Sequence, residues 1–205
     1  TSRGCPLRCD FCAASILIAP AYRQKPMEHV LAEIDRIWEL WNRPFIEFAD
    51  DNAFVNRRYW KRLLPELARR RVRWFAEPDL SLYEDAELLE LMRESGCAQV
   101  LIGKRRWSGH YREAVRRIQS HGIRVNGCFV LGLDAHGPEV FDDVYDFAEE
   151  LELFDVQITL QTPFPGTPLF ERLRREGRLL HEGQWERCTL FDINFQPKQM
   201  SVEEL

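Results

Sequence analysis

The sequence has 205 residues, of which 45% are hydrophobic and 30% charged, so it can bury the core of one globular domain. A complete eight-unit β/α barrel usually needs roughly 250 residues, so any barrel here is expected to be partial. The net charge is −5 with acids and bases interspersed, which argues against nucleic acid as a partner. No apolar run reaches the length of a membrane span, and no membrane partner is expected.

The beginning of the sequence indicates a piece of a longer protein. The first residue is Thr1 rather than Met, and a cysteine motif starts almost at once, at Cys5. A strand that would normally lead into such a motif is missing. We therefore expect the first strand of the domain to lie outside this chain.

Strand and helix patterns alternate along the chain. Apolar residues recur at helical spacing in six segments, at residues 26–41, 56–71, 85–95, 111–121, 138–152 and 168–176. Short apolar runs typical of buried strands lie between them, at residues 45–49, 72–76, 98–102, 125–131 and 156–160. The first of these strands is expected to stop at the Asp50-Asp51-Asn52 triplet. Regular alternation predicts an α/β fold with mostly parallel strands, arranged as a partial (β/α) barrel.

The chemistry of such barrels lies at the carboxyl ends of the strands. Polar residues and a glycine occupy these positions, namely Asp50, Asp51, Glu77, Gly103, Asp134 and Gln161. They are candidate functional residues before any motif is considered.

Three of the six cysteines crowd into eight residues, in the segment from Gly4 to Cys12 with C-x3-C-x2-C spacing. Thiolates are the ligands that iron–sulfur clusters require, so Cys5, Cys9 and Cys12 can hold three irons of a cubane. The fourth iron then has no ligand within the motif and is open to a small molecule. A chain of this length with its own core does not need a disulfide framework, so reduced cysteines in the cytoplasm are expected.

Three other interpretations compete with this one. A structural zinc site would need four ligands, usually in two separated pairs, and no second pair exists. An electron carrier of the ferredoxin type would need a fourth cysteine, which Cys97, Cys128 or Cys188 could supply only if the fold brought it close. Three unrelated core cysteines are the last alternative, but a polar loop rich in Gly, Pro and Arg is a poor place for core residues.

The cysteine spacing, with Phe11 just before the third cysteine, resembles the radical S-adenosylmethionine (radical SAM) superfamily. The similarity runs from Thr1 to about Leu180. The segments 1–6, 22–26 and 162–169 look like the branch of this superfamily that has an N-terminal cobalamin-binding domain. Related segments also occur in methylthiotransferases.

This resemblance implies the cofactors and the reaction. A [4Fe-4S] cluster on the three cysteines binds S-adenosylmethionine at its open iron and cleaves it to a 5′-deoxyadenosyl radical, which abstracts hydrogen from a small-molecule substrate. The branch implies cobalamin, bound by a domain outside this chain, and methyl transfer or a rearrangement. A one-electron donor such as flavodoxin or ferredoxin is the expected partner. A methylthiotransferase-like enzyme and a non-catalytic iron–sulfur electron carrier are the alternatives.

The resemblance also implies cofactor-binding residues on the first two strands and the cysteine loop. Phe11 is one of them, and Asp50 or Asp51 would contact the methionine amino group through a charge-assisted bond. A turn or helix cap before Asn56 would explain the two aspartates equally well. Glu77 and Ser81 flank the end of the next strand, where an ordinary solvated turn is the competing interpretation.

The remaining cofactor positions lie in the second half of the chain. Gly127 resembles the glycine that lets the adenine approach the backbone, although a simple bulge would also select it. Thr162 and Pro163 resemble the loop that closes the adenine side, although turn chemistry alone would place them there. After Gly103 the family pattern of a ribose-contacting residue is lost. We expect residues 1–180 to form the radical SAM core and residues 181–205 to begin a family-specific extension.

Overall fold

The computed structural model describes residues 1–104 and 109–205. The strands of its main sheet are β3 (Phe45–Ala53), β4 (Arg73–Pro78), β5 (Cys97–Lys104), β6 (Arg124–Leu131) and β7 (Asp155–Leu160). The α-helices are α1 (Met27–Leu40), α2 (Arg57–Arg70), α3 (Ala86–Glu94), α4 (Gly109–Ser120), α5 (Val140–Glu150) and α6 (Pro168–Arg175). Two short strands, β1 (Ser2–Arg3) and β2 (Arg23–Gln24), a π-helix (Ala14–Ile18) and two 3₁₀ turns (Leu80–Glu84 and Trp185–Arg187) complete the elements.

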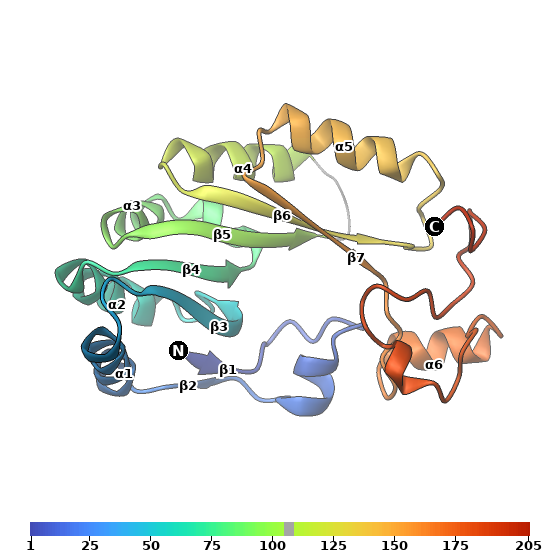
Figure 1. The fold of residues 1–205 in the computed structure, drawn as a ribbon, viewed down its shortest axis with the longest axis horizontal. Helices are drawn as coiled ribbons and strands as arrows, with labels where there is room; N and C mark the ends of the chain where they lie inside the picture. The colour runs from blue at the N-terminus through green and yellow to red at the C-terminus, as the bar shows by residue number, and fades with distance from the viewer. Residues whose placement is uncertain (105–108) are drawn as a thin grey trace.

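The five main strands lie side by side in sequence order, and every neighbouring pair is parallel. The sheet is curved, with α2 to α5 on its outer side, α6 beyond the carboxyl ends of its strands and the chain before β3 below it (Figure 1). This is the α/β, mostly parallel, partial-barrel arrangement that the alternation predicted. Because all five strands run the same way, their carboxyl ends meet at one edge of the sheet.

Side chains that point toward the helices form the main core. Val100, Ile102, Val125 and Phe129 from the central strands are fully buried there. Alternate residues of the same strands point to the concave side and are only partly covered, as Leu101, Cys128 and Val130 are. The two faces of the sheet therefore differ in kind. The outer face is packed, and the concave face is available to a ligand.

One boundary prediction was wrong. Strand β3 does not stop at Asp50-Asp51-Asn52 but continues to Ala53. Asp50 and Asn52 point into the protein and are 3% and 5% exposed, while Asp51 points to the concave side and is exposed. The helix cap is made by Asn56, whose side chain accepts a hydrogen bond from the backbone N–H of Tyr59. The two aspartates are thus neither a turn nor a cap.

The segment after residue 180 packs back onto the core. Phe195 is fully buried, and a β-bridge joins it to Leu179. Leu160 at the end of β7 donates its backbone N–H to the carbonyl oxygen of Leu190. A division of the chain at residue 180 remains a prediction.

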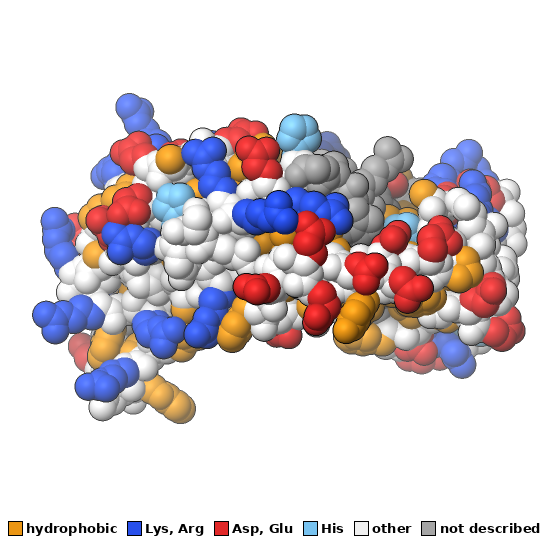
Figure 2. Space-filling view, turned by 90° about the horizontal axis from the view of Figure 1, so that it is seen from above, with side chains coloured by type: hydrophobic (Ala, Val, Ile, Leu, Met, Phe, Trp, Pro, Cys, Tyr) orange, Lys and Arg blue, Asp and Glu red, His pale blue; other side chains and the backbone are white. Residues whose placement is uncertain are grey.

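The outer surface carries charges of both signs. Seen from the helix side, acidic side chains gather over α5 and basic ones lie toward the amino-terminal end of the strands (Figure 2). Among the residues that the structure describes, no helix is both long and apolar enough to cross a membrane.

Candidate functional site

The cysteine loop is fixed to the carboxyl end of the sheet by its glycine. Gly4 has a φ of +79°, and a Cβ atom there would lie 2.6 Å from the carbonyl oxygen of Ala21. Its backbone N–H donates a 2.8 Å hydrogen bond to Oδ2 of Asp51 on β3. A side chain at this position would be strained and would collide with the backbone, so the tight approach requires glycine.

The first thiol of the loop is more deeply buried than the other two. Cys5 is 8% exposed, whereas Cys9 and Cys12 are half-buried. The backbone N–H of Cys12 bonds to the carbonyl oxygen of Cys9 at 3.0 Å, which closes a turn between these two residues. The Cys12 sulfur in turn accepts a hydrogen bond from the backbone N–H of Ser15 at 3.4 Å. All six cysteines of the chain are free thiols.

This donor set fits an iron–sulfur cluster better than a single metal ion. Within residues 1–104 and 109–205, no three His, Cys, Asp or Glu side chains converge to hold one metal ion. A cubane binds each thiolate at a different iron atom, so its ligands need not meet at one point. Cys97 is buried in the main core and Cys128 lies on the concave face of β6, so neither belongs to the loop. The chemistry of three soft donors on one short loop is that of a cluster with an open corner.

Asn52 connects the cysteine loop to the next strand. Its Oδ1 accepts the backbone N–H of Asp79 at 2.9 Å, and its Nδ2 donates to Oδ2 of Asp79 at 3.1 Å. The same Nδ2 lies 3.8 Å from the Cys5 sulfur, within the range of a weak N–H···S bond. Because Oδ1 is held by a backbone N–H, the amide nitrogen has to face the sulfur. The sequence analysis missed this residue.

The two predicted aspartates differ in what they already bind. The buried carboxylate of Asp50 accepts hydrogen bonds from the hydroxyl groups of Thr1 and Ser2, so it joins β1 to β3. Asp51 is exposed, and of its two carboxylate oxygens only Oδ2 accepts a hydrogen bond from the Gly4 N–H. Of the two, Asp51 is therefore the one that can contact a ligand on the concave side.

A cavity of about 230 Å³ opens on the concave face at the carboxyl ends of the strands. Its lining comes from the cysteine loop, from β4 to β7, from the loop after β7 and from the C-terminal segment. The lining residues are Phe11, Glu77, Leu101, Cys128, Val130, Gln157, Thr159, Leu160, Gln161, Thr162, Phe164 and Leu190. Three predicted cofactor residues, Phe11, Glu77 and Thr162, are thus brought together at one mostly apolar cavity.

Two titratable groups in this cavity have raised pKa values. Partial desolvation raises the pKa of Glu77, and the nearby carboxylates of Glu47 and Asp51 raise it further. Burial raises the pKa of the Cys128 thiol, and the charge of Glu77 adds to that effect. The Cys128 thiol is therefore neutral at physiological pH. The same environment disfavours the binding of a further negative charge in the cavity.

Three predicted cofactor residues lie away from this cavity. The Ser81 hydroxyl and carbonyl oxygens both accept from Arg57, at 2.9 and 2.8 Å. Pro163 lines a separate small pocket beside Trp185. Gly127 faces the packed side of the sheet, where a Cβ atom would lie 2.7 Å from Leu153 and from Phe129. Close core packing explains this glycine on its own, and a ligand role for these three residues stays a prediction.

A second cavity, of about 510 Å³, lies on the other side of Gln161. Asp10 of the cysteine loop, the loop after β6 and Arg172 of α6 are part of its lining. His136 also lines it; burial lowers the pKa of this histidine, an effect that the charges of Glu139 and Asp143 oppose. Gln161, at a strand end that the sequence analysis singled out, belongs to both cavities.

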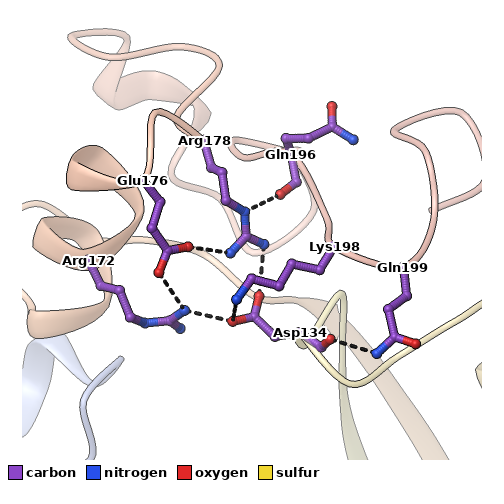
Figure 3. A network of polar contacts seen from close by, with 7 residues as sticks. All are labelled: Asp134, Arg172, Glu176, Arg178, Gln196, Lys198 and Gln199. Atoms are coloured by element: carbon purple, nitrogen blue, oxygen red, sulfur yellow. Dashed lines mark hydrogen bonds and ion pairs between the residues drawn. The ribbon is translucent and has the colours of Figure 1, made fainter.

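Asp134, another predicted strand-end position, is the centre of a polar network beside the second cavity (Figure 3). Its carboxylate bonds to Arg172 at 2.6 Å and to Arg178 at 2.8 Å, and its backbone carbonyl oxygen accepts from the Gln199 side chain. Burial would raise the pKa of Asp134, but Arg178 and Arg172 outweigh it and lower this pKa to about 2. The network fixes the C-terminal segment to the end of β6.

The position where the family pattern expects a ribose contact falls after Gly103. Residues 105–108 lie outside the described part of the chain. The loss of the family's ribose-contacting pattern after Gly103 therefore falls on residues that the structure does not describe.

The sequence of residues 1–131 matches the profile of the Radical SAM superfamily. The chain belongs to this superfamily. Bacteriochlorophyllide d C-12(1)-methyltransferase of Chlorobaculum tepidum is 29% identical over 220 residues, covering 100% of this chain and 48% of that protein. The hopanoid C-2 methylase of Rhodopseudomonas palustris is 34% identical over 205 residues, covering 90% of this chain and 39% of the relative.

A solved structure confirms the fold. The radical SAM methyltransferase TsrM from Kitasatospora setae, with cobalamin and a [4Fe-4S] cluster bound, superposes with a TM-score of 0.74 at 20% identity. The match covers 86% of this chain and 36% of TsrM. This chain spans less than half the length of each of these three proteins. The prediction that the chain belongs to the radical SAM superfamily is confirmed by the family match.

Proposed function

We propose that this chain is the catalytic core of a cobalamin-dependent radical SAM methyltransferase. The observation that supports it is the position of the three-thiol loop. The Gly4–Asp51 bond fixes this loop to the carboxyl edge of a parallel sheet, and Phe11 of the same loop lines the apolar cavity there. Methyl transfer and cobalamin come from the named relatives, and their substrates are not assigned to this chain.

In this proposal Cys5, Cys9 and Cys12 hold a [4Fe-4S] cluster whose fourth iron is left for S-adenosylmethionine. When bound, the cluster supplies the electron that cleaves S-adenosylmethionine to a 5′-deoxyadenosyl radical. Asn52 donates its amide N–H toward the Cys5 sulfur and so helps to orient this ligand.

The residues of the concave face bind and orient the nucleoside part. Oδ1 of Asp51 is available to accept a hydrogen bond from the methionine amino group, because the Gly4 backbone N–H donates only to Oδ2. Phe11, Leu101 and Val130 give the cavity apolar walls, which exclude water from a reactive radical. Glu77 and Thr162 add polar side chains to its lining for the sugar and base.

A cobalamin-binding domain outside this chain, a small-molecule substrate and a one-electron donor complete the proposal. A reduced cluster is sensitive to oxygen, so a reducing, cytoplasmic location is part of it. A methylthiotransferase-like activity is not favoured by any residue described here.

The test uses the full-length protein, purified and reconstituted with iron and sulfide without oxygen. Reduction with photoreduced 5-deazaflavin in the presence of S-adenosylmethionine should yield 5′-deoxyadenosine or a methylated product with S-adenosylhomocysteine. Cys9→Ala should lose the cluster absorption near 400 nm, whereas Cys188→Ala, a half-buried thiol outside the loop, should retain it. A full cluster in Cys9→Ala would contradict the ligand set, and a cluster that never cleaves S-adenosylmethionine would indicate an electron carrier.

A further inference from the structure

The larger cavity, of about 510 Å³, has a lining that is more acidic than basic. The described residues that line it include the carboxylates of Asp10, Asp134, Glu139 and Asp143 and the guanidinium of Arg172. Arg172 already bonds to Asp134 at 2.6 Å, so these two charges balance each other (Figure 3). The described lining as a whole therefore carries a net negative charge.

Glu139 and Asp143 have no basic side chain to balance them. Glu139 is the N-cap of α5, and Asp143 lies in its first turn, on the surface where acidic side chains gather (Figure 2). Neither forms an ion pair in the described part of the chain, whereas Glu150 near the other end of the helix pairs with Arg112 at 2.8 Å. The amino terminus of a helix favours acidic side chains on its own. A neighbouring histidine decides between this explanation and a binding site.

The histidine, His136, is a buried part of the same lining. It is only 9% exposed, and its Nδ1 has no hydrogen-bond partner among the residues that the structure describes. A buried polar atom of this kind costs free energy unless another molecule binds it. The charges of Glu139 and Asp143 act on the His136 ring, so the three groups lie within electrostatic reach of one another. Helix capping explains the carboxylates but does not explain the unpartnered ring nitrogen.

The chemistry of the lining favours an organic cation. Leu133 and Val140 add apolar side chains beside the carboxylates. In the part of the chain that the structure describes, no three His, Cys, Asp or Glu side chains converge as metal ligands do. An ammonium group on an alkyl chain matches both parts of the lining, because the charge meets carboxylates and the chain meets apolar carbon. A cavity of this volume suits a small molecule.

The position of the cavity indicates which molecule enters it. Gln161 at the end of β7 lines both cavities, so the larger one adjoins the apolar one. Under the proposed function, the apolar cavity holds the nucleoside on which the radical forms. A molecule in the larger cavity lies next to that nucleoside, where a radical enzyme needs its substrate.

We propose that the larger cavity binds a small molecule with a protonated primary amine on an alkyl chain, and that this molecule is the substrate. The ammonium group lies against Glu139 and Asp143, the His136 ring supplies a further polar contact, and the chain lies on Leu133 and Val140. The binding itself is independent of the reaction. Only the assignment of the bound molecule as the substrate rests on the proposed function.

The experiment uses the full-length protein with its cluster reconstituted, and n-butylammonium as the probe. A ligand-observed NMR titration measures its dissociation constant, with 1-butanol and butyrate as uncharged and anionic probes of the same chain length. The double variant Glu139→Gln, Asp143→Asn removes two carboxylates from the lining. The matched control is Asp142→Asn, Asp146→Asn, which makes the same charge change at two exposed positions of α5 outside the lining.

We expect butylammonium to bind more tightly than 1-butanol, and butyrate to show no saturable binding. The lining variant should weaken butylammonium binding on the order of 10-fold, while the control should bind as the wild type does. His136→Leu should also weaken binding without lowering the free energy of unfolding, because it replaces a buried polar group that has no partner. S-adenosylmethionine and butylammonium should bind at the same time.

Equal weakening in the lining and control variants would overturn the site, since the charge of α5 as a whole would then attract the cation. Equal affinity for 1-butanol would overturn it too, because the cavity would then select only apolar chains. Displacement of butylammonium by S-adenosylmethionine would contradict a separate substrate site. Displacement by magnesium chloride, but not by sodium chloride of the same ionic strength, would indicate a metal site instead.

The proposed function is tested separately. Failure of the wild type to cleave S-adenosylmethionine after reduction would count against that function and against the substrate assignment. The dissociation constants of the lining and control variants would still decide whether the cavity binds an ammonium group.

Discussion

Replacing Asp134 by Asn should destabilise the protein in a way that depends on pH. The pKa of Asp134 is about 2 in the folded chain, against an ordinary value of 3.8. Each pKa unit corresponds to about 1.4 kcal/mol, so the charged form of this side chain contributes about 2 kcal/mol to the free energy of unfolding. The Asp134 side chain is 29% exposed and its Arg178 partner 11%, so solvent screens the pair only in part.

The sign follows from the lowered pKa. The stabilisation is fully present above the unfolded value near 4, and it is lost as the pH falls from there toward 2. Urea unfolding of wild type and Asp134→Asn between pH 7 and pH 3 measures it. The difference in free energy of unfolding should be about 2 kcal/mol at pH 7 and should shrink at the acidic end.

Asp35→Asn is the matched control. Asp35 also pairs with an arginine, Arg70, but its side chain is 52% exposed. A surface pair of this kind is worth about 0–1 kcal/mol, so the control should lose much less stability. A loss in Asp134→Asn no larger than in the control, or one that does not vary with pH, would refute the reasoning.

Three further substitutions test the cysteine loop, its support and the packed face of the sheet. Gly4→Ala should lower the free energy of unfolding by at least about 1–2 kcal/mol, because the backbone at this position is left-handed. It should also lower the iron content after reconstitution, because the new Cβ would collide with Ala21. A normal iron content would contradict the tight approach. Asn52→Leu should shift the midpoint potential of the cluster to a more negative value, because it removes an N–H···S donor. A redox titration followed by electron paramagnetic resonance measures this potential, and an unchanged value would show that the amide serves structure alone. Gly127→Ala should reduce the free energy of unfolding by about 1–3 kcal/mol, since its Cβ meets Leu153 and Phe129 in the core, while Gly103→Ala, where the nearest atom is 3.7 Å away, should lose less.

The order of strands and helices could be predicted because burial imposes a period on the sequence. The strands β3 to β6 carry buried apolar residues toward the helices, and the helices repeat theirs every three to four positions. The end of β3 could not be predicted in the same way. Asp50 continues the strand because Thr1 and Ser2 satisfy its carboxylate, and these residues lie 49 and 48 positions earlier. Local pattern carries no information about such partners.

In the candidate site too, features set by local sequence could be predicted, and features that depend on distant partners could not. The three-cysteine loop could be proposed as a cluster site because the spacing of its cysteines is itself the signal, and its ligand role stays a prediction. Asn52 was missed because its partners, Cys5 and Asp79, are 47 and 27 positions away. Ser81 was predicted from its place after a strand, but Arg57, 24 positions earlier, holds both of its oxygen atoms. Short β1 and β2, with two residues each, were too small to leave any period.

The bond between Leu160 and Leu190 has a consequence for how this radical SAM core could diversify. It draws a residue of the C-terminal segment into the wall of the cavity, next to residues supplied by the sheet. The part of the wall that Leu190 forms is thus encoded outside the strands that carry the cysteine loop and its supports. Under the proposed function, substitutions in that segment can reshape the space offered to a substrate while the cysteine loop stays unchanged, so selectivity and radical generation can evolve separately.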